Sequence, residues 1–321
     1  IKTTPTRKIA PSFAAIYRET ILNYDQVLNE RYNGKEDGDE MLLMIMPDNF
    51  FEYFEDYIEW KKICGFKVMA VKFSDIGASS SNPVTIRDYI SDVYATSQTP
   101  PTYVTIVGDA DEFPYKIAVY SDYSFPDEDY FVKVAGDDFI PDIFIGRISV
   151  QTTNTLQVIL NKLLLYEQSP LIDESNWFMK GICCSNNLYE SQVTTKEYTA
   201  GLMRNEGNFV RVDEYMSDAN WEEDCTYTME DVLEALNEGR SFLNYRGEGW
   251  NSGWWANCTP FHLDDLDFLQ NANKLTFVTS IGCGVAMFNA NYGNSFGERW
   301  LKMGTLENPR GAVNFVGPTS N

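Results

Sequence analysis

Two places in the sequence combine an apolar run with glycines and a side chain that can do chemistry. In residues 242–250 (FLNYRGEGW) a predicted strand leads into Gly-Glu-Gly, and in residues 277–284 (FVTSIGCG) a second one leads into Gly-Cys-Gly. Glycines beside a cysteine at a strand end let a substrate backbone approach closely and leave main-chain N–H groups free. This pattern indicates nucleophilic catalysis by Cys283, although two tight turns and one more core cysteine would have the same composition.

The chain has a single histidine, His262, so a zinc site with two or more histidine ligands is excluded. His262 lies in residues 259–265, between the two glycine-rich turns. We expect a structural histidine bonded to a nearby carboxylate, and the alternative is a base that folds back towards Cys283. The six cysteines show no CxxC spacing, so most of them are expected to be buried and reduced.

Acidic residues gather in several predicted loops, at 109–112, 127–129, 137–138 and 264–267. Ca²⁺ takes six to eight oxygen ligands, and loops of this kind supply carboxylates and carbonyls. No segment fits the EF-hand pattern, and a solvated acidic surface is the competing interpretation. The candidate calcium ligands are Asp109, Asp111, Asp127, Asp129, Asp137 and Asp138.

Composition excludes several classes of protein. The 321 residues include 25 Lys and Arg against 47 Asp and Glu, a net charge of −22, which argues against binding to nucleic acid phosphates. No apolar stretch reaches the 18 residues that indicate a membrane span. No glycine-rich phosphate loop supports a nucleotide, so no organic cofactor is expected. The 44% of hydrophobic residues is enough for a packed core.

Predicted strands and helices alternate along the chain. The strands are 42–46, 67–73, 102–107, 143–148, 181–184, 209–212, 241–245, 275–281 and 311–316. The helices are 49–64, 83–96, 152–167, one near 196–204, and one that opens on the capping box Thr228-Met-Glu-Asp231 and stops at Gly239. This alternation predicts a mostly parallel sheet flanked by helices, with ligands at the carboxyl ends of the strands. We divide the chain into a lead-in (1–40) and two α/β subdomains (41–150 and 151–321).

Several motifs together resemble one protein family. They are Asn-Tyr-x-Gly-x-Gly at 244–249, a strand-end cysteine 283 − 248 = 35 positions later, YVTIVGD at 103–109, DEDY at 127–130, VAGDD at 134–138 and DIFIGRIS at 142–149. They are similar to the catalytic domain of gingipain-type cysteine peptidases over roughly residues 102–321, and the Ile-Gly-Arg-x-Ser block is the most specific part. The resemblance implies a caspase-like fold built as two α/β subdomains.

The resemblance also implies roles for individual residues. Cys283 takes the position of the nucleophile, the N–H groups of Cys283 and Gly249 form the oxyanion hole, and Glu248 occupies the position of the family's histidine. It further implies peptide or protein substrates, an extracellular or cell-surface bacterial protein, and calcium sites. The candidate residues of the substrate cleft are Trp250, Trp254, Trp255 and Asp127, and the alternative for the tryptophans is a turn closed over the core.

Glutamate is a poor substitute for histidine at this position. A free glutamic acid has a pKa of ~4.3 and a free thiol one of ~8.5, so proton transfer is uphill by about 4 units, or roughly 6 kcal/mol. A carboxylate beside the thiol also disfavours the thiolate. We therefore predict an impaired or inactive cysteine peptidase. The alternatives are a non-catalytic binding or scaffold module that keeps the fold, and an unrelated doubly wound α/β protein with a ligand at the strand ends.

Overall fold

The structure is a computed structural model that describes residues 9–26, 39–121, 123–136, 138–216, 227–255, 260–289 and 293–320. The chain divides into two compact units, and each is considered by itself. Unit 1 comprises Ile1–Lys116 and Glu128–Ile148, and unit 2 comprises Ile117–Asp127 and Ser149–Asn321.

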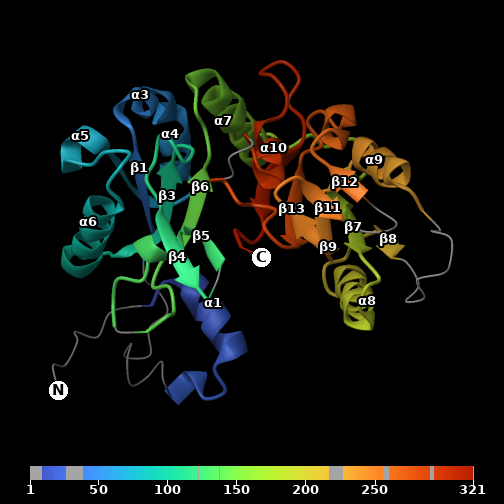
Figure 1. The fold of residues 1–321 in the computed structure, drawn as a ribbon, viewed down its shortest axis with the longest axis horizontal. Coiled ribbons are helices and arrows are strands. Elements are labelled where there is room, and N and C mark those ends of the chain that lie inside the picture. Colours follow the sequence, from blue (N-terminus) through green and yellow to red (C-terminus); the bar gives the residue numbers. More distant parts are fainter. Residues whose placement is uncertain are drawn as a thin grey trace. The chain divides into compact units, whose positions relative to one another are not determined.

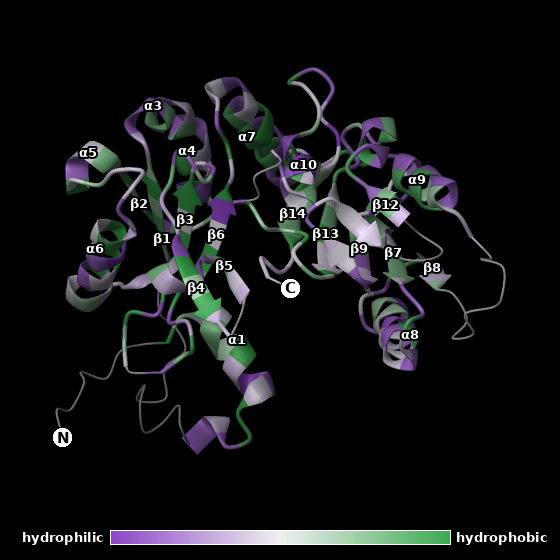
Figure 2. Ribbon diagram, in the orientation of Figure 1, coloured by the Kyte–Doolittle hydropathy of each residue, from purple (hydrophilic) through white to green (hydrophobic). Residues whose placement is uncertain are grey.

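Unit 1 is built on a parallel sheet with the order β2-β1-β3-β6 in the described part of the chain (Figure 1). Its strands are β1 (Met41–Met46), β2 (Lys67–Lys72), β3 (Pro101–Val107) and β6 (Phe144–Ile148). Its helices are α1 (Pro11–Thr20), α3 (Asp48–Phe51), η1 (Glu52–Phe54), α4 (Glu55–Ile63), α5 (Phe73–Ile76), α6 (Pro83–Thr96) and η2 (Asp129–Phe131). All six residues of β1 are buried, as expected for a strand covered on both faces. Figure 2 shows the hydropathy of β1 and β3, the two central strands of this sheet.

The first helix after β1 differs from its prediction. A single helix was expected over residues 49–64, whereas the structure has α3, the 3-10 turn η1 and α4 in succession. Phe50 and Phe54 are both fully buried, and the backbone tightens between these two anchored rings. The helix predicted at 83–96 is confirmed with the same ends as α6, where the Asn82 side chain accepts from the Val84 N–H at 3.1 Å.

Unit 2 is built on a larger parallel sheet, with the order β14-β13-β9-β7-β8 among the described residues. Its strands are β7 (Lys180–Ser185), β8 (Arg211–Met216), β9 (Phe242–Arg246), β13 (Thr276–Ile281) and β14 (Ala312–Val316). Its helices are α7 (Thr153–Gln168), η3 (Trp177–Met179), α8 (Glu190–Asn205), α9 (Met229–Glu238), η4 (Asp265–Phe268) and α10 (Phe296–Lys302). The capping box is confirmed: the Thr228 side chain accepts from the Asp231 N–H at the start of α9.

Two small antiparallel sheets in unit 2 were not predicted. β4 (Lys116–Tyr120) pairs with β5 (Tyr123–Asp127), and β10 (Gly249–Trp250), β11 (Gly253–Trp255) and β12 (Pro260–His262) form a second sheet in that order. The strands of the second sheet, with two or three residues each, give too little alternation to be recognised in a sequence. The predicted class, a mostly parallel α/β fold flanked by helices, is confirmed, and among the described residues no helix has the length and apolar character needed to cross a membrane.

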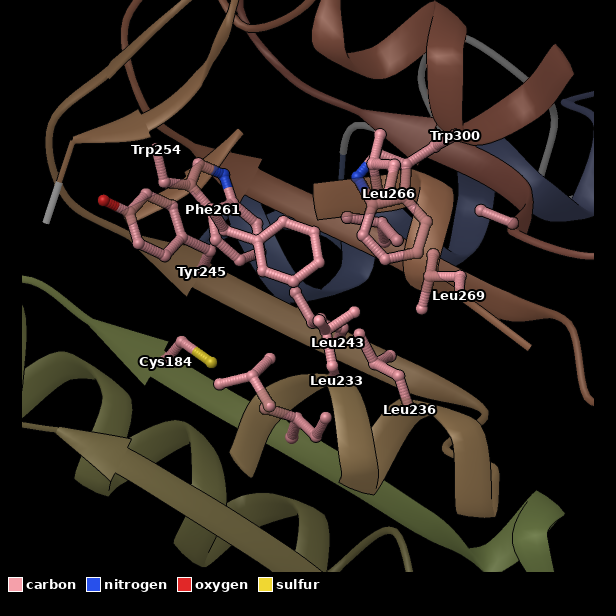
Figure 3. Packing of buried hydrophobic residues seen from close by; sticks show 14 of the residues in the cluster. Cys184, Leu233, Leu236, Leu243, Tyr245, Trp254, Phe261, Leu266, Leu269 and Trp300 are labelled. Carbon is pink, nitrogen blue, oxygen red and sulfur yellow. The ribbon is translucent and has the colours of Figure 1, made fainter. Parts of the chain in front are cut away.

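The large sheet of unit 2 has two different faces. On one face, here called the aromatic face, Leu243 and Tyr245 of β9 pack with α9, α10 and the small sheet (Figure 3). The defining aromatic residues are Tyr245, Trp254, Phe261, Phe296 and Trp300. On the opposite face, here called the polar face, α8 covers a row of strand residues that includes Cys183, Asn244 and Thr279, and Lys196 of α8 reaches Asn244. Because side chains alternate along a strand, neighbouring residues of β9 serve different faces.

Candidate active site

Glu248 and Cys283 occupy matching positions beyond two adjacent strands. β9 and β13 are parallel neighbours that pair Arg246 with Ile281 at their carboxyl ends. Each candidate residue lies two positions further on, after Gly247 or Gly282, and the Gly247 N–H continues the ladder by donating to the Ile281 carbonyl at 3.0 Å. Neighbouring strands lie about 4.8 Å apart, so this register places Glu248 beside Cys283. The predicted adjacency of the two strand ends is confirmed.

The glycines around the site are required by close packing. A Cβ on Gly249 would lie 3.1 Å from the carbonyl carbon of Gly282 and 2.7 Å from Val285, so the two loops touch through bare backbone. A Cβ on Gly247 would lie 2.4 Å from the Tyr245 hydroxyl. Since none of Gly247, Gly249 and Gly282 has a positive φ, the contacts and not the backbone conformation select glycine here. Gly284 differs, because its φ of 62° is in the left-handed region.

The Cys283 loop is exposed and anchored at its base. Cys283 itself is an exposed free cysteine, and Glu248 is exposed as well. The Gly284 N–H donates to the Ser320 carbonyl at 2.8 Å, and the Ala286 N–H donates to the Pro318 carbonyl at 3.0 Å. In the part of the chain that the structure describes, the Cys283 N–H has no backbone acceptor. The thiol is therefore accessible from solvent.

The Glu248–Gly249 peptide is held from one side. Its carbonyl accepts hydrogen bonds from the Tyr245 hydroxyl at 2.7 Å and from the Trp255 N–H at 3.1 Å. Because Glu248 and Trp255 are the hydrogen-bonded pair, Gly249 and Trp254 form the following non-hydrogen-bonded pair of β10 and β11. The Gly249 N–H thus points away from β11, as a donor of the predicted oxyanion hole must.

Tyr245 contacts both loops of the site and was not among the site residues predicted from the sequence. Its side chain is fully buried and stacks on Trp254 with ring centroids 4.1 Å apart and an interplanar angle of 9°. Burial raises the pKa of Tyr245 far above its usual value. The phenol therefore stays protonated and donates. The signal in the sequence was its position two residues after Leu243, which places both on the same face of the strand.

The candidate cleft residues fall into two groups. Trp250 and Trp255 are exposed, by 46% and 57%, whereas Trp254 is fully buried and donates from Nε1 to Ser280 Oγ at 2.9 Å. The prediction of Trp254 as a cleft residue is therefore wrong, and the alternative of a turn closed over the core holds for it. β11 alternates, so Trp254 must face the core if Trp255 faces solvent.

Asp127 is the last residue of β5 and is half-buried. The residue before it, Pro126, accepts a hydrogen bond from Thr319 Oγ1 at 2.9 Å, and Thr319 lies within the segment that anchors the Cys283 loop. This connection keeps the end of β5 close to the base of that loop. The cleft role of Asp127 stays a prediction.

His262 lies on the far strand of the small sheet from Gly249. It pairs with Gly253 on β11, and Gly253 pairs with Trp250 on β10, so about 10 Å of sheet separates His262 from the edge that faces Cys283. Its main-chain N–H donates to the Asp265 carboxylate at 2.7 Å, while the buried ring Nε2 has no partner among the described residues. The expected bond between the His262 side chain and a carboxylate is therefore not found among the described residues, and the bond to Asp265 is made by the main chain.

The candidate calcium ligands do not converge in the described part of the chain, where no group of three or more His, Cys, Asp or Glu residues could hold a metal ion. Asp109 accepts from the Ala110 N–H at 2.7 Å, Asp129 lies 3.6 Å from the Lys133 ammonium, and Asp138 accepts from the Ile140 N–H at 2.9 Å. These carboxylates already have partners. Asp111 lies in the same loop as Asp109, and Asp137 is outside the described residues.

Comparison with known proteins defines the class. The chain matches peptidase family C25 over residues 35–321. The crystal structure of the Arg-specific cysteine proteinase gingipain R superposes with a TM-score of 0.77 at 21% identity, covering 89% of this chain and 64% of that one. The RgpB pro- and mature-domain complex from Porphyromonas gingivalis gives a TM-score of 0.76 at 23% identity, covering 88% of this chain and 64% of that one. The fold is therefore caspase-like α/β.

The chain belongs to peptidase family C25, the gingipain family. Gingipain R2 from Porphyromonas gingivalis strain W83 is 24% identical over 318 residues, which are 96% of this chain but only 40% of that protein. Lys-gingipain W83 from Porphyromonas gingivalis is 25% identical over 292 residues, 87% of this chain and 15% of its own length. The resemblance read from the motifs is confirmed, and the interpretation as an unrelated doubly wound protein is wrong.

Proposed function

We propose that this chain is a gingipain-like cysteine peptidase domain in which Cys283 is the nucleophile and Glu248 occupies the position of the dyad histidine. The observation that carries the proposal is the shared register of β9 and β13, which brings Glu248 and Cys283 side by side over the contact between Gly249 and Gly282. The N–H groups of Cys283 and Gly249 would stabilise the oxyanion that forms when the thiolate attacks a peptide carbonyl. Its substrates would be peptides or proteins.

Glu248 impairs this reaction in two ways. A carboxylate ionised at neutral pH does not take a proton from a thiol readily, and it has no proton to give to the leaving amine. Its negative charge also opposes formation of the thiolate beside it. We therefore expect peptide hydrolysis far below the rate of an enzyme with a histidine–cysteine dyad.

Turnover of a mixed peptide library by the parent chain and two site variants tests this proposal. We expect slow cleavage by the parent, partial recovery with Glu248→His and none with Cys283→Ala. Glu234→His on α9 and Cys64→Ala serve as controls, because both replace exposed residues of the same types outside the two loops of the site. Brisk cleavage by the parent that Cys283→Ala abolishes would mean that another base serves the thiol. Cleavage that survives Cys283→Ala would rule out the cysteine mechanism.

A non-catalytic pseudopeptidase that binds peptides is the alternative function. It is favoured by the position of the single histidine, which lies across the small sheet from the Cys283 side. A peptidyl chloromethyl ketone separates the two. Covalent labelling of Cys283 supports the peptidase, while reversible peptide binding without labelling supports the binding module.

Calcium binding and location are further proposals that rest on the resemblance. The candidate ligands lie in the acidic loops at 109–112, 127–129 and 137–138 and do not converge among the described residues, so this proposal rests on the resemblance alone. Chelation should lower the melting temperature if a cation is bound there. An unchanged melting temperature would contradict calcium binding. We also infer an extracellular or cell-surface location, which fractionation of the producing cells would test.

A further inference from the structure

The Tyr245 hydroxyl lies where it can control the orientation of the oxyanion-hole donor. A peptide unit is planar and trans, so its C=O and N–H point in opposite directions. The Glu248 carbonyl accepts from the Tyr245 hydroxyl and from the Trp255 N–H of β11. Fixing this carbonyl fixes the opposite direction of the Gly249 N–H, which belongs to the same peptide unit.

We propose that Tyr245 is a positioning residue, whose hydroxyl orients and polarises the Glu248–Gly249 peptide so that the Gly249 N–H serves as the oxyanion donor. This inference rests on the proposed function of Cys283. A carbonyl that accepts two hydrogen bonds polarises its peptide unit and strengthens the N–H at the other end as a donor. Of the two donors that the described residues supply to this carbonyl, only Tyr245 uses a side chain, and it is therefore the one that substitution can remove.

The surroundings of Tyr245 hold the hydroxyl in place. Its ring stacks on Trp254, which is itself fixed by the bond from Nε1 to Ser280 Oγ. Gly282 lies over the ring, where a Cβ would come within 3.2 Å of Tyr245 Cε1. Gly247 lies over the hydroxyl, where a Cβ would come within 2.4 Å of the phenol oxygen. Because Gly247 and Gly282 have no Cβ, Tyr245 can pack directly beneath both loops of the site.

Two probes of the Cys283 thiol separate orientation of the oxyanion donor from reactivity of the sulfur. An acetyl-tripeptide aldehyde forms a hemithioacetal: the sulfur bonds to the aldehyde carbon, the carbonyl π pair moves to the oxygen, and that oxygen takes up the thiol proton. The new oxygen occupies the oxyanion hole. Iodoacetamide alkylates the same sulfur by displacing iodide, with no oxyanion at any stage. Neither probe needs a general acid for a leaving amine.

The experiment compares the parent with Tyr245→Phe, which keeps the ring and removes the hydroxyl. The aldehyde is the best binder from a set of acetyl-tripeptide aldehydes with different last residues, and its labelled carbonyl carbon reports the hemithioacetal by NMR. We expect Tyr245→Phe to weaken aldehyde binding about tenfold, as loss of one aligned hydrogen bond predicts, and to leave the alkylation rate unchanged.

Tyr227→Phe is the matched control. Tyr227 is also buried, and its hydroxyl also donates to a backbone carbonyl, that of Ser185 at 3.3 Å, but outside the two loops of the site. This variant should match the parent with both probes. Gly247→Ala is the second test variant if Tyr245→Phe does not fold, because the added Cβ displaces the hydroxyl while the phenol remains. It should weaken aldehyde binding in the same way.

The outcomes distinguish this inference from the proposed function. The positioning role is overturned if Tyr245→Phe binds the aldehyde as tightly as the parent. It is also overturned if this variant lowers the aldehyde affinity and the alkylation rate by the same factor. In both cases Cys283 remains the nucleophile. If the parent forms no hemithioacetal although iodoacetamide labels Cys283, the oxyanion hole is absent. In that case both the proposed function and the role of Tyr245 are contradicted.

Discussion

The two faces of the large sheet in unit 2 contain different chemistry although they share the same strands. On the aromatic face, Tyr245 and Trp254 stack and reach the loops of the candidate site through the Glu248 carbonyl. On the polar face, Lys196 donates to the Asn244 side chain, which in turn donates to Thr279 Oγ1. The aromatic face therefore supports the loops of the site, while on the polar face the hydrogen bonds join α8 to the strands beneath it.

Two described lysines of unit 2 are buried, and they use different kinds of hydrogen-bond acceptor. Lys162, on α7, donates to the carbonyls of Trp300, Leu301 and Met303 at the end of α10, the shortest bond being 2.7 Å to Leu301. Lys196, on α8, uses a side-chain amide instead. Among the described residues neither lysine forms an ion pair. The α10 helix that Lys162 caps donates from Phe296 and Gly297 to the Asn251 and Val285 carbonyls, and so holds both loops of the site.

The largest effect is expected from the aromatic face. Trp254→Ala should lower the free energy of unfolding by about 4 kcal/mol, because it leaves a cavity beneath Tyr245. Phe277→Ala is the control, since Phe277 is half-buried on the polar face, where it stacks on Phe242. Urea denaturation measures both. An equal loss in the free energy of unfolding for the two variants would contradict the larger contribution assigned to the aromatic face.

A smaller loss is expected from the polar network. Asn244→Leu removes the acceptor of Lys196 and should lower the free energy of unfolding by about 3 kcal/mol, because the ammonium is left buried without a partner. The double variant Asn244→Leu with Lys196→Met should recover most of this loss, since both partners become apolar. If the double variant is no more stable than Asn244→Leu, the bond between the two side chains does not matter.

The buried lysine at the end of α10 makes stability depend on pH. Burial lowers the pKa of Lys162 from 10.5 to about 7. Between these values the unfolded chain holds a proton that the folded chain has lost, so stability rises with pH in this window. From pH 7 to 8.5 the parent should gain about 1–2 kcal/mol relative to Lys162→Met. Parallel curves for the two proteins would show that Lys162 keeps its proton when folded.

Much of the fold was predictable from the sequence, because the long buried strands and the Thr228 capping box leave clear patterns. The adjacency of Glu248 and Cys283 was also predictable, since both follow strands that the motifs pair. The small sheet around Trp254 was not, because strands of two or three residues show no periodicity. Nor was the hydrogen bond of Tyr245, because an alternating pattern shows which face a side chain occupies and not which acceptor it reaches.

The rate at which iodoacetamide alkylates Cys283 at neutral pH tests the central claim, that a carboxylate beside the thiol suppresses its reactivity. Peptide mapping by mass spectrometry separates Cys283 from the other cysteines, and exposed Cys64 is the internal reference. Glu248→Gln should speed alkylation of Cys283 several-fold, and Glu248→His should speed it more, because each removes the charge that opposes the thiolate. Identical rates at Cys283 in the parent and both variants would contradict the account.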